Sequence, residues 1–125
     1  MNYEEMAPKE FSITVLKAYK PEIFERDIEI KDIGDGGIAV FENGLAGVDT
    51  FVLAFNANRP DDVWPIIVDN NIEIEWVSKT HCVAVHHIND DELISSGIKK
   101  KQEALRAAMI CFLLKMEDGD RERML

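Results

Sequence analysis

The spacing of apolar residues predicts a helix near each end of the chain. Over residues 7–19, apolar side chains recur at helical spacing, and Pro8 suits the first helical turn. Residues 100–117 are apolar almost all the way round, and we expect this second helix to end near Gly119. A helix of that kind lies either at the centre of a core or in a contact with a second subunit.

Alternating apolar and polar residues predict strands over residues 28–31 and 72–76, between these two helices. The tetrapeptide at residues 34–37, Gly-Asp-Gly-Gly, provides residues that tolerate a positive φ, so it predicts the turn of a hairpin. The expected strands cover residues 28–31, 38–41, 50–55, 72–76 and 82–88.

Together these elements predict an α+β fold. We expect an antiparallel sheet of about five strands packed against the long C-terminal helix, with the N-terminal helix beside it and a short central helix. A single domain is expected to span residues 1–125, with residues 119–125 as a frayed tail.

Pro65 interrupts the most apolar stretch of the central chain, where we expect the short helix. If Asp62 caps that helix, Pro65 stands at the third helical position, where no intrahelical amide donor is lost. If the helix begins at Pro60, Pro65 lies inside it and kinks it. In either case we expect one apolar face on this helix, formed by Trp64, Ile67 and Val68.

The composition is that of a folded, acidic protein. Of 125 residues, 46% are hydrophobic and 30% are charged, which is enough apolar material for a core and argues against global disorder. No apolar run approaches the roughly 20 residues that a membrane-spanning helix needs. The first residues lack the basic and apolar regions of a signal peptide, so we expect a cytoplasmic protein.

The formal net charge of −10 bears on the choice of partner. Non-specific binding to a phosphate backbone requires basic surface, so we expect no direct binding to nucleic acid. Acidic surface instead attracts basic partners, including the positive grooves in which other proteins hold DNA or RNA.

One cluster has the side chains of a metal site: His86 and His87, followed by Asp90, Asp91 and Glu92. The two histidines are neighbours on an expected strand, so they point to opposite faces and at most one joins the acids easily. The alternative is an ordinary acidic turn after a strand.

Cys82 and Cys111 both lie in apolar runs, which indicates two reduced core residues rather than a disulfide. A nucleophile pair of Cys82 with His81, His86 or His87 is the alternative, but nothing in the sequence marks a residue that would orient the base. Gly-x-Ser-x-Gly and zinc-finger spacings are absent. We therefore expect a protein without catalytic residues or a cofactor.

Two stretches resemble motifs of the phage NinX-like family. Residues 58–70, NRPDDVWPIIVDN, resemble its Asp-x-Trp-Pro-Ile-Ile motif, and residues 104–114, ALRAAMICFLL, resemble its Leu-Arg-Ala-Ala-Met-Ile motif. Tyr3 also fits. Val63 stands where the family usually has alanine, Ala104 stands where it has proline, and the hairpin region matches only in general character.

The resemblance implies a small accessory protein of a phage or prophage, and it carries over no catalytic residue. It also implies that Asp61, Asp62, Trp64, Pro65 and Arg106 belong to a structural unit. In that unit the Trp-Pro-Ile-Ile segment packs on the C-terminal helix and Arg106 lies near Asp61, Asp62 or Asp69. A buried arginine needs such an acidic partner, although a ligand-binding Arg106 is the alternative.

We expect a non-enzymatic protein that binds a host protein or ribonucleoprotein complex with a basic surface. Three observations favour it: the resemblance to a phage family, the net charge of −10 and the lack of a catalytic cluster in the sequence. The specific hypothesis is an inhibitor of host defence, such as an anti-CRISPR protein. The alternatives are a recombination or replication accessory factor, and a metal-dependent enzyme. A homodimer is compatible with each. The expected contact residues are Glu25, Asp27, Glu29, Asp32, Asp35, Glu42, Asp90, Asp91 and Glu92.

Overall fold

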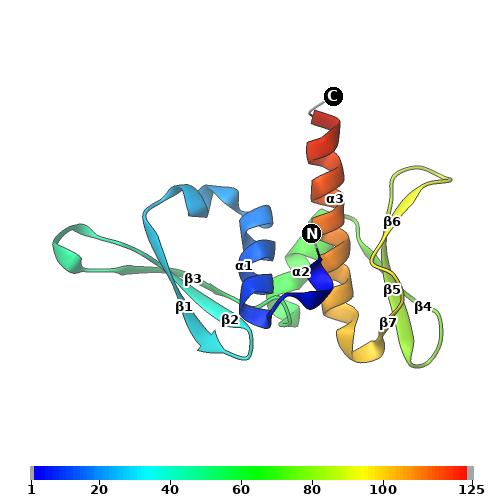
Figure 1. The fold of residues 1–125 in the computed structure, drawn as a ribbon, viewed down its shortest axis with the longest axis horizontal. Helices are drawn as coiled ribbons and strands as arrows, with labels where there is room; N and C mark the ends of the chain where they lie inside the picture. The colour runs from blue at the N-terminus through cyan, green and yellow to red at the C-terminus, as the bar shows by residue number, and fades with distance from the viewer. Residues whose placement is uncertain (1, 124–125) are drawn as a thin grey trace. The chain divides into compact units, whose positions relative to one another are not determined.

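The computed structural model describes residues 2–123, with side chains described through residue 118. The chain divides into two compact units, Met1–Arg59 (unit 1) and Pro60–Leu125 (unit 2). Each unit combines helices with its own antiparallel sheet (Figure 1). The α+β class is therefore confirmed. The expectation of one domain over residues 1–125 stays a prediction, because the structure defines each unit by itself.

Unit 1 begins with the predicted N-terminal helix. Pro8 is its first residue, where a missing amide hydrogen costs nothing, and the helix ends before Pro21. The elements of unit 1 are η1 (Tyr3–Glu5), α1 (Pro8–Tyr19), η2 (Pro21–Glu25), β1 (Ile28–Gly34), β2 (Gly37–Glu42), η3 (Leu45–Gly47) and β3 (Thr50–Phe55).

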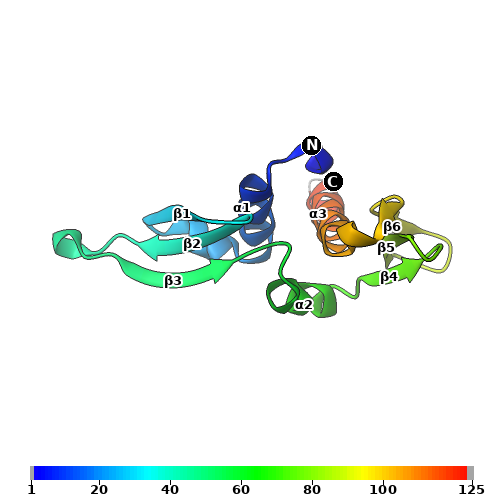
Figure 2. The ribbon, with the colours of Figure 1, turned by 90° about the horizontal axis from the view of Figure 1, so that it is seen from below.

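The three strands of unit 1 form an antiparallel sheet with β2 in the middle (Figure 2). The predicted hairpin turn joins β1 to β2, and Gly34, Asp35 and Gly36 there have φ values of 91°, 54° and 82°. The predicted turn and its strands are confirmed. One face of the sheet is covered by α1, which contacts β2. Phe11, Val15, Leu16, Ile38 and Val40 are buried in this core.

Unit 2 contains a second sheet, with β5 at its centre. Its strand order is β4-β5-β6, and β7 pairs with the other end of β5. The C-terminal helix contacts all four strands and α2. The elements of unit 2 are α2 (Pro60–Asp69), β4 (Glu73–Trp76), β5 (His81–His87), β6 (Leu93–Ser95), β7 (Lys99–Lys100), η4 (Lys101–Glu103) and α3 (Ala104–Arg123).

The prediction of one sheet of about five strands is wrong, since the described residues form one sheet of three strands and another of four. The two sheets separate at α2, because β4 pairs with β5 and not with β3. The strands β6 and β7 have three and two residues, too few for an alternating pattern to reveal them in a polar segment.

The core of unit 2 includes seven consecutive buried residues of α3, from Ala107 to Leu113. The helix predicted to be apolar all round is therefore a core helix, and its backbone continues past Gly119 to Arg123. The expectation of a frayed tail falls partly on residues 124 and 125, which lie outside the described residues. Within the described residues, no helix is both long enough and apolar enough to span a membrane.

The central helix α2 begins at Pro60, so Pro65 lies inside it as its sixth residue. Its buried side chains are Val63, Ile66 and Ile67, whereas Trp64 and Val68 are 63% and 53% exposed. Of the apolar face predicted for this helix, only Ile67 is therefore buried. Both sets of residues recur at helical spacing, so the pattern alone did not decide which face is buried. The helix ends at Asp69, and Asn71, two residues later, lies in the left-handed region at φ 52°.

Candidate binding surfaces

Three of the six acidic residues expected to contact a partner in unit 1 stabilise the hairpin. The carboxylate of Asp27 accepts a hydrogen bond from the Asn43 side chain at 3.0 Å. That of Asp32 accepts one from the Gly34 amide at 2.8 Å and so holds the turn. Glu42 forms an ion pair with the arginine that precedes Asp27. These three carboxylates therefore already have partners within unit 1.

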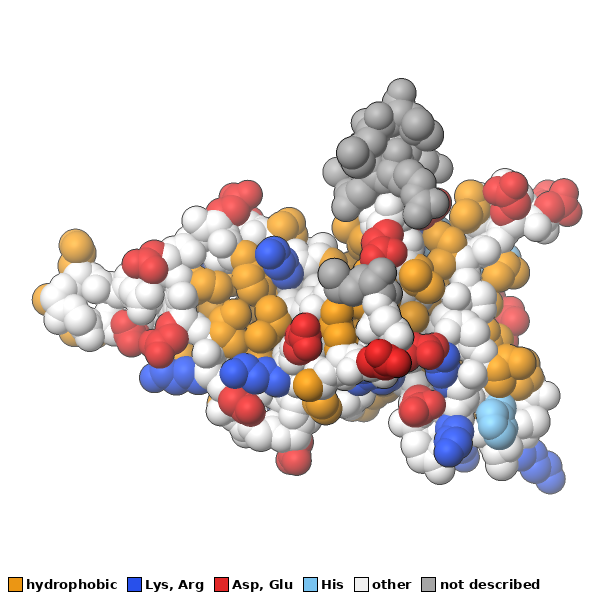
Figure 3. Space-filling view, in the orientation of Figure 1, with side chains coloured by type: hydrophobic (Ala, Val, Ile, Leu, Met, Phe, Trp, Pro, Cys, Tyr) orange, Lys and Arg blue, Asp and Glu red, His pale blue; other side chains and the backbone are white. Residues whose placement is uncertain are grey.

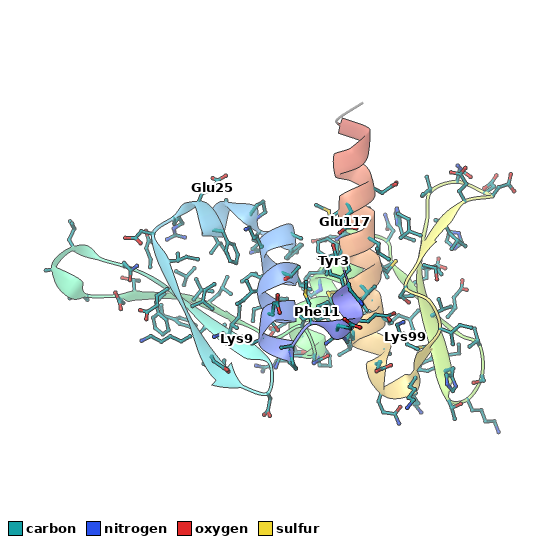
Figure 4. All side chains as sticks on the ribbon, in the orientation of Figure 1. Tyr3, Lys9, Phe11, Glu25, Lys99 and Glu117 are labelled. Carbon is teal, nitrogen blue, oxygen red and sulfur yellow. The ribbon has the colours of Figure 1, made fainter. Side chains whose placement is uncertain are left out.

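The other three, Glu25, Glu29 and Asp35, are exposed. Within the described part of the chain their carboxylates form no ion pair and no hydrogen bond. Glu25 lies at the end of η2 and points outward (Figure 4). These three side chains keep their full charge available to a partner.

The three candidate contact residues of unit 2, Asp90, Asp91 and Glu92, occupy the turn between β5 and β6. The Asn89 side chain organises this turn, because its oxygen accepts hydrogen bonds from the amides of Asp91 and Glu92, both at 3.0 Å. Its amide nitrogen donates to the carboxylate of Glu92 at 3.3 Å. Asp90 and Asp91 point into solvent at the tip. The segment is thus an ordered acidic turn with two exposed carboxylates.

The net negative charge of the chain is divided equally between the two units. Unit 1 has 11 acidic and 6 basic residues, and unit 2 has 13 acidic and 8 basic residues. Each unit therefore contributes −5 to the formal charge of −10. The candidate contact residues form two sets, one that extends from the end of η2 along the β1–β2 hairpin of unit 1 and one in the β5–β6 turn of unit 2.

The structure does not gather the metal ligands that the sequence suggested. His86 and His87 lie on opposite faces of β5, as expected for strand neighbours, and His86 is half-buried. His87 instead lies 3.6 Å from the carboxylate of Glu73. Glu73, Glu75 and His87 place one possible ligand atom each within 4.8 Å of one another, all three exposed. Sequence reasoning missed the two glutamates because only the β4–β5 pairing brings them beside His87.

Both cysteines are free and buried, which confirms them as reduced core residues. Burial raises the pKa of Cys111 to about 11, and the positive charge of Lys115 opposes part of that rise. Burial, helped by the nearby Glu103 carboxylate, also raises the pKa of Cys82. A protonated thiol is a poor nucleophile, so neither cysteine has the environment of a catalytic one.

The two motifs that resembled a family meet in unit 2, because α2 packs against α3. The exposed Trp64 ring borders an open pocket of about 280 Å³ at this contact. Arg106 is half-buried on α3, and its pairing with an aspartate of α2 stays a prediction. The residues lining the pocket are Pro60, Asp61, Trp64, Pro65, Ile67 and Leu105.

A second open pocket, of about 460 Å³, lies at the turn between β4 and β5. It was not anticipated from the sequence, although Trp76 and Lys79 lie close together along the chain. Its second lysine, Lys101, comes from the start of η4, and only the fold brings it to the turn. The lining residues are Trp76, Val77, Ser78, Lys79 and Lys101.

Comparison with known proteins identifies a family for this chain. A protein-family model described as Bacteriophage P22, NinX matches residues 2–116. No curated protein and no solved structure matches the chain. The match takes in all of unit 1 except its first residue, together with the α2 and α3 motifs of unit 2. It therefore extends well beyond the two motifs, and the chain belongs to the NinX family of bacteriophage P22.

Proposed function

We propose that this protein is a non-enzymatic phage accessory protein that binds a protein or ribonucleoprotein complex of the bacterial host, in the host cytosol. In its specific form it inhibits a host defence or nucleic-acid-handling complex, such as a CRISPR effector. Its acidic side chains occupy a basic groove that otherwise holds nucleic acid.

The observation that supports this proposal is the set of exposed carboxylates without partners. Glu25, Glu29 and Asp35 on unit 1 form no ion pair within the described residues, and Asp90 and Asp91 project from an ordered turn on unit 2. Such charges attract a basic surface and speed its association, but they add little affinity where they stay in water.

Affinity therefore needs an apolar anchor as well, and Trp64 has the properties of one. Its side chain is 63% exposed on α2 beside an open pocket. Tryptophan is among the residues that contribute most to protein interfaces, because its large ring buries much area with few rotatable bonds. We expect Trp64 to be covered when the partner binds.

A metal-dependent enzyme is the second candidate, favoured by the grouping of Glu73, Glu75 and His87. Two carboxylates and an imidazole suit a divalent transition metal and leave coordination positions open for water. Elemental analysis of the purified protein separates the two functions. A stoichiometric metal that is lost in His87→Ala supports the enzyme, and a metal content far below one per chain supports the binding protein.

Charge reversal tests the proposed binding directly. The first variant carries Glu25→Lys, Glu29→Lys and Asp35→Lys, and the second carries Asp90→Lys and Asp91→Lys. A matched control changes the same number of charges as the first variant elsewhere on unit 1, through Glu5→Lys, Glu10→Lys and Asp49→Lys, three exposed residues outside η2 and β1. We expect reversal of at least one set to weaken partner binding about ten-fold.

The control variant should retain most of the affinity, because its changes alter net charge without touching either set. An unchanged dissociation constant after both sets are reversed together contradicts the proposal. An equal loss of affinity in the control variant also contradicts it, because net charge alone would then explain the effect.

A further inference from the structure

Lysine is concentrated at one place in unit 2, against the acidic character of the chain. Lys79 lies in the β4–β5 turn, Lys99 and Lys100 form β7, and Lys101 opens η4. The pairing of β7 with β5 places Lys100 opposite His81. Figure 3 shows basic side chains and a histidine near one another at the lower right, with acidic side chains between the basic ones and the centre of the view.

The same place exposes an aromatic ring. Trp76, at the end of β4, is 56% exposed, and Val77 after it is 53% exposed. Together with Ser78, Lys79 and Lys101 they line the open pocket of about 460 Å³. That volume lies within the range of small-ligand sites and suits an object the size of one nucleotide.

The turn that carries these side chains is fixed by hydrogen bonds. The Ser78 hydroxyl oxygen accepts from the amides of Thr80 and His81, at 3.2 and 3.1 Å. The amide of Lys101 donates to the carbonyl oxygen of Thr80 at 2.9 Å, which ties η4 to the turn. The aromatic ring and the lysines are thus held on a preformed scaffold, and a ligand need not order it.

We propose that this turn binds single-stranded nucleic acid, with a base stacked on Trp76 and the neighbouring phosphates held by Lys79, Lys100 and Lys101. Stacking platforms flanked by cations are how proteins bind single strands without reading their sequence. The expectation of no nucleic-acid binding rested on the net charge of the whole chain, whereas this lysine cluster is local. Two acidic residues lie close by in the chain, Glu75 directly before Trp76 and Glu103 on η4.

Fluorescence anisotropy with labelled oligothymidine of about 15 nucleotides, at roughly 50 mM salt, tests the proposal. Trp76→Ala removes the platform and should weaken binding about ten-fold. Lys79→Glu with Lys101→Glu should weaken binding and lower the slope of log K against log salt by about 0.7 for each lysine. Circular dichroism of each variant verifies that it is folded, which the exposure of these side chains favours.

Two controls match these variants. Trp64→Ala removes the other exposed tryptophan, and Lys9→Glu with Lys17→Glu makes the same charge change on α1. Both should bind oligothymidine as the unchanged protein does. The two acidic sets are intact in all of these proteins, so the result is independent of host-protein binding.

Three outcomes overturn the proposal. The first is no binding of oligothymidine at roughly 50 mM salt. The second is a loss of affinity in the controls equal to that in the Trp76 and lysine variants. The third is competition by polyglutamate as effective as that by unlabelled oligothymidine, which would make the turn a site for acidic polypeptides.

Discussion

The Ser12 hydroxyl donates a hydrogen bond to the carbonyl oxygen of Gly36 at 2.6 Å, and so ties α1 to the β1–β2 turn. The Ser12 hydroxyl oxygen in turn accepts a hydrogen bond from the amide of Ala57 at 3.0 Å. Ser12 is 1% exposed, so one buried hydroxyl satisfies two backbone groups from distant parts of unit 1.

Ser12→Ala should lower the free energy of unfolding by about 1–3 kcal/mol, because it leaves both backbone groups without this partner. Urea denaturation measures the change. Thr14→Ala is the control, since its hydroxyl bonds only to the Glu10 carbonyl oxygen one turn earlier in α1 and to the sulfur of Met6. A loss in Ser12→Ala no greater than that in the control contradicts this role of the hydroxyl.

Gly36→Ala should destabilise unit 1 more than Gly34→Ala does. Both glycines have a positive φ, of 82° and 91°, so an alanine is strained at either position. At Gly36 the added methyl group would also lie 2.8 Å from Cβ of Pro8, whereas at Gly34 it meets open space.

We expect a loss above roughly 1 kcal/mol for Gly36→Ala and a smaller one for Gly34→Ala, both from chemical denaturation. The difference between the two variants isolates the contact with Pro8. Equal losses would show that backbone strain alone accounts for the effect.

Pro65→Ala should raise the free energy of unfolding by roughly 1 kcal/mol. Pro65 lies inside α2 and cannot donate to the carbonyl oxygen of Asp61, four residues earlier, whereas alanine can. Pro60→Ala is the matched control, because proline at the first helical position loses no hydrogen bond. Thermal and urea unfolding of both variants measure the effect. Destabilisation by Pro65→Ala would mean that the proline ring itself contributes to packing.

Cys111 should make stability fall at alkaline pH. Its pKa in the folded protein is about 11, above the ordinary value of 9.0, so the folded state holds this proton more tightly than the unfolded state does. The resulting stabilisation is complete below the ordinary pKa and is lost as the pH rises through about 11.

The free energy of unfolding at about pH 8 and about pH 10 measures this effect. The unchanged protein should lose more stability between the two than Cys111→Ala, which lacks the thiol. The two proteins differ only at residue 111, so the difference between their losses reports on the thiol. Identical losses contradict the assigned pKa.

Local patterns predicted most of the secondary structure but not its assembly. Alternation located β1 and β4, turn residues marked the starts of β2 and β3, and Pro8 marked the start of α1, because these signals depend only on neighbours in sequence. The division into two sheets depends on which strands pair after α2, and no local pattern records that choice. The burial of Ser12 and Ser96 also follows from tertiary packing alone.

The candidate surfaces were predicted less well. The partner contacts of the acidic residues stay a prediction, and the hydrogen bonds of Asp27 and Asp32 became visible only in the folded hairpin. Proximity along the chain predicted a metal cluster that included His86 and Asp90. In the structure, strand pairing instead places Glu73 beside His87. Lys101 reaches the Trp76 pocket in the same way, through the pairing of segments that are far apart in sequence.

Affinity purification from host lysate at low and moderate salt most directly tests the central claim, that exposed carboxylates bind a host complex. Tagged protein and the variant with both acidic sets reversed are compared by quantitative mass spectrometry. The account predicts one nucleic-acid-binding or defence complex with the unchanged protein, reduced at moderate salt and absent with the variant. Equal recovery of that complex by both proteins, or no enriched complex at either salt concentration, would contradict it.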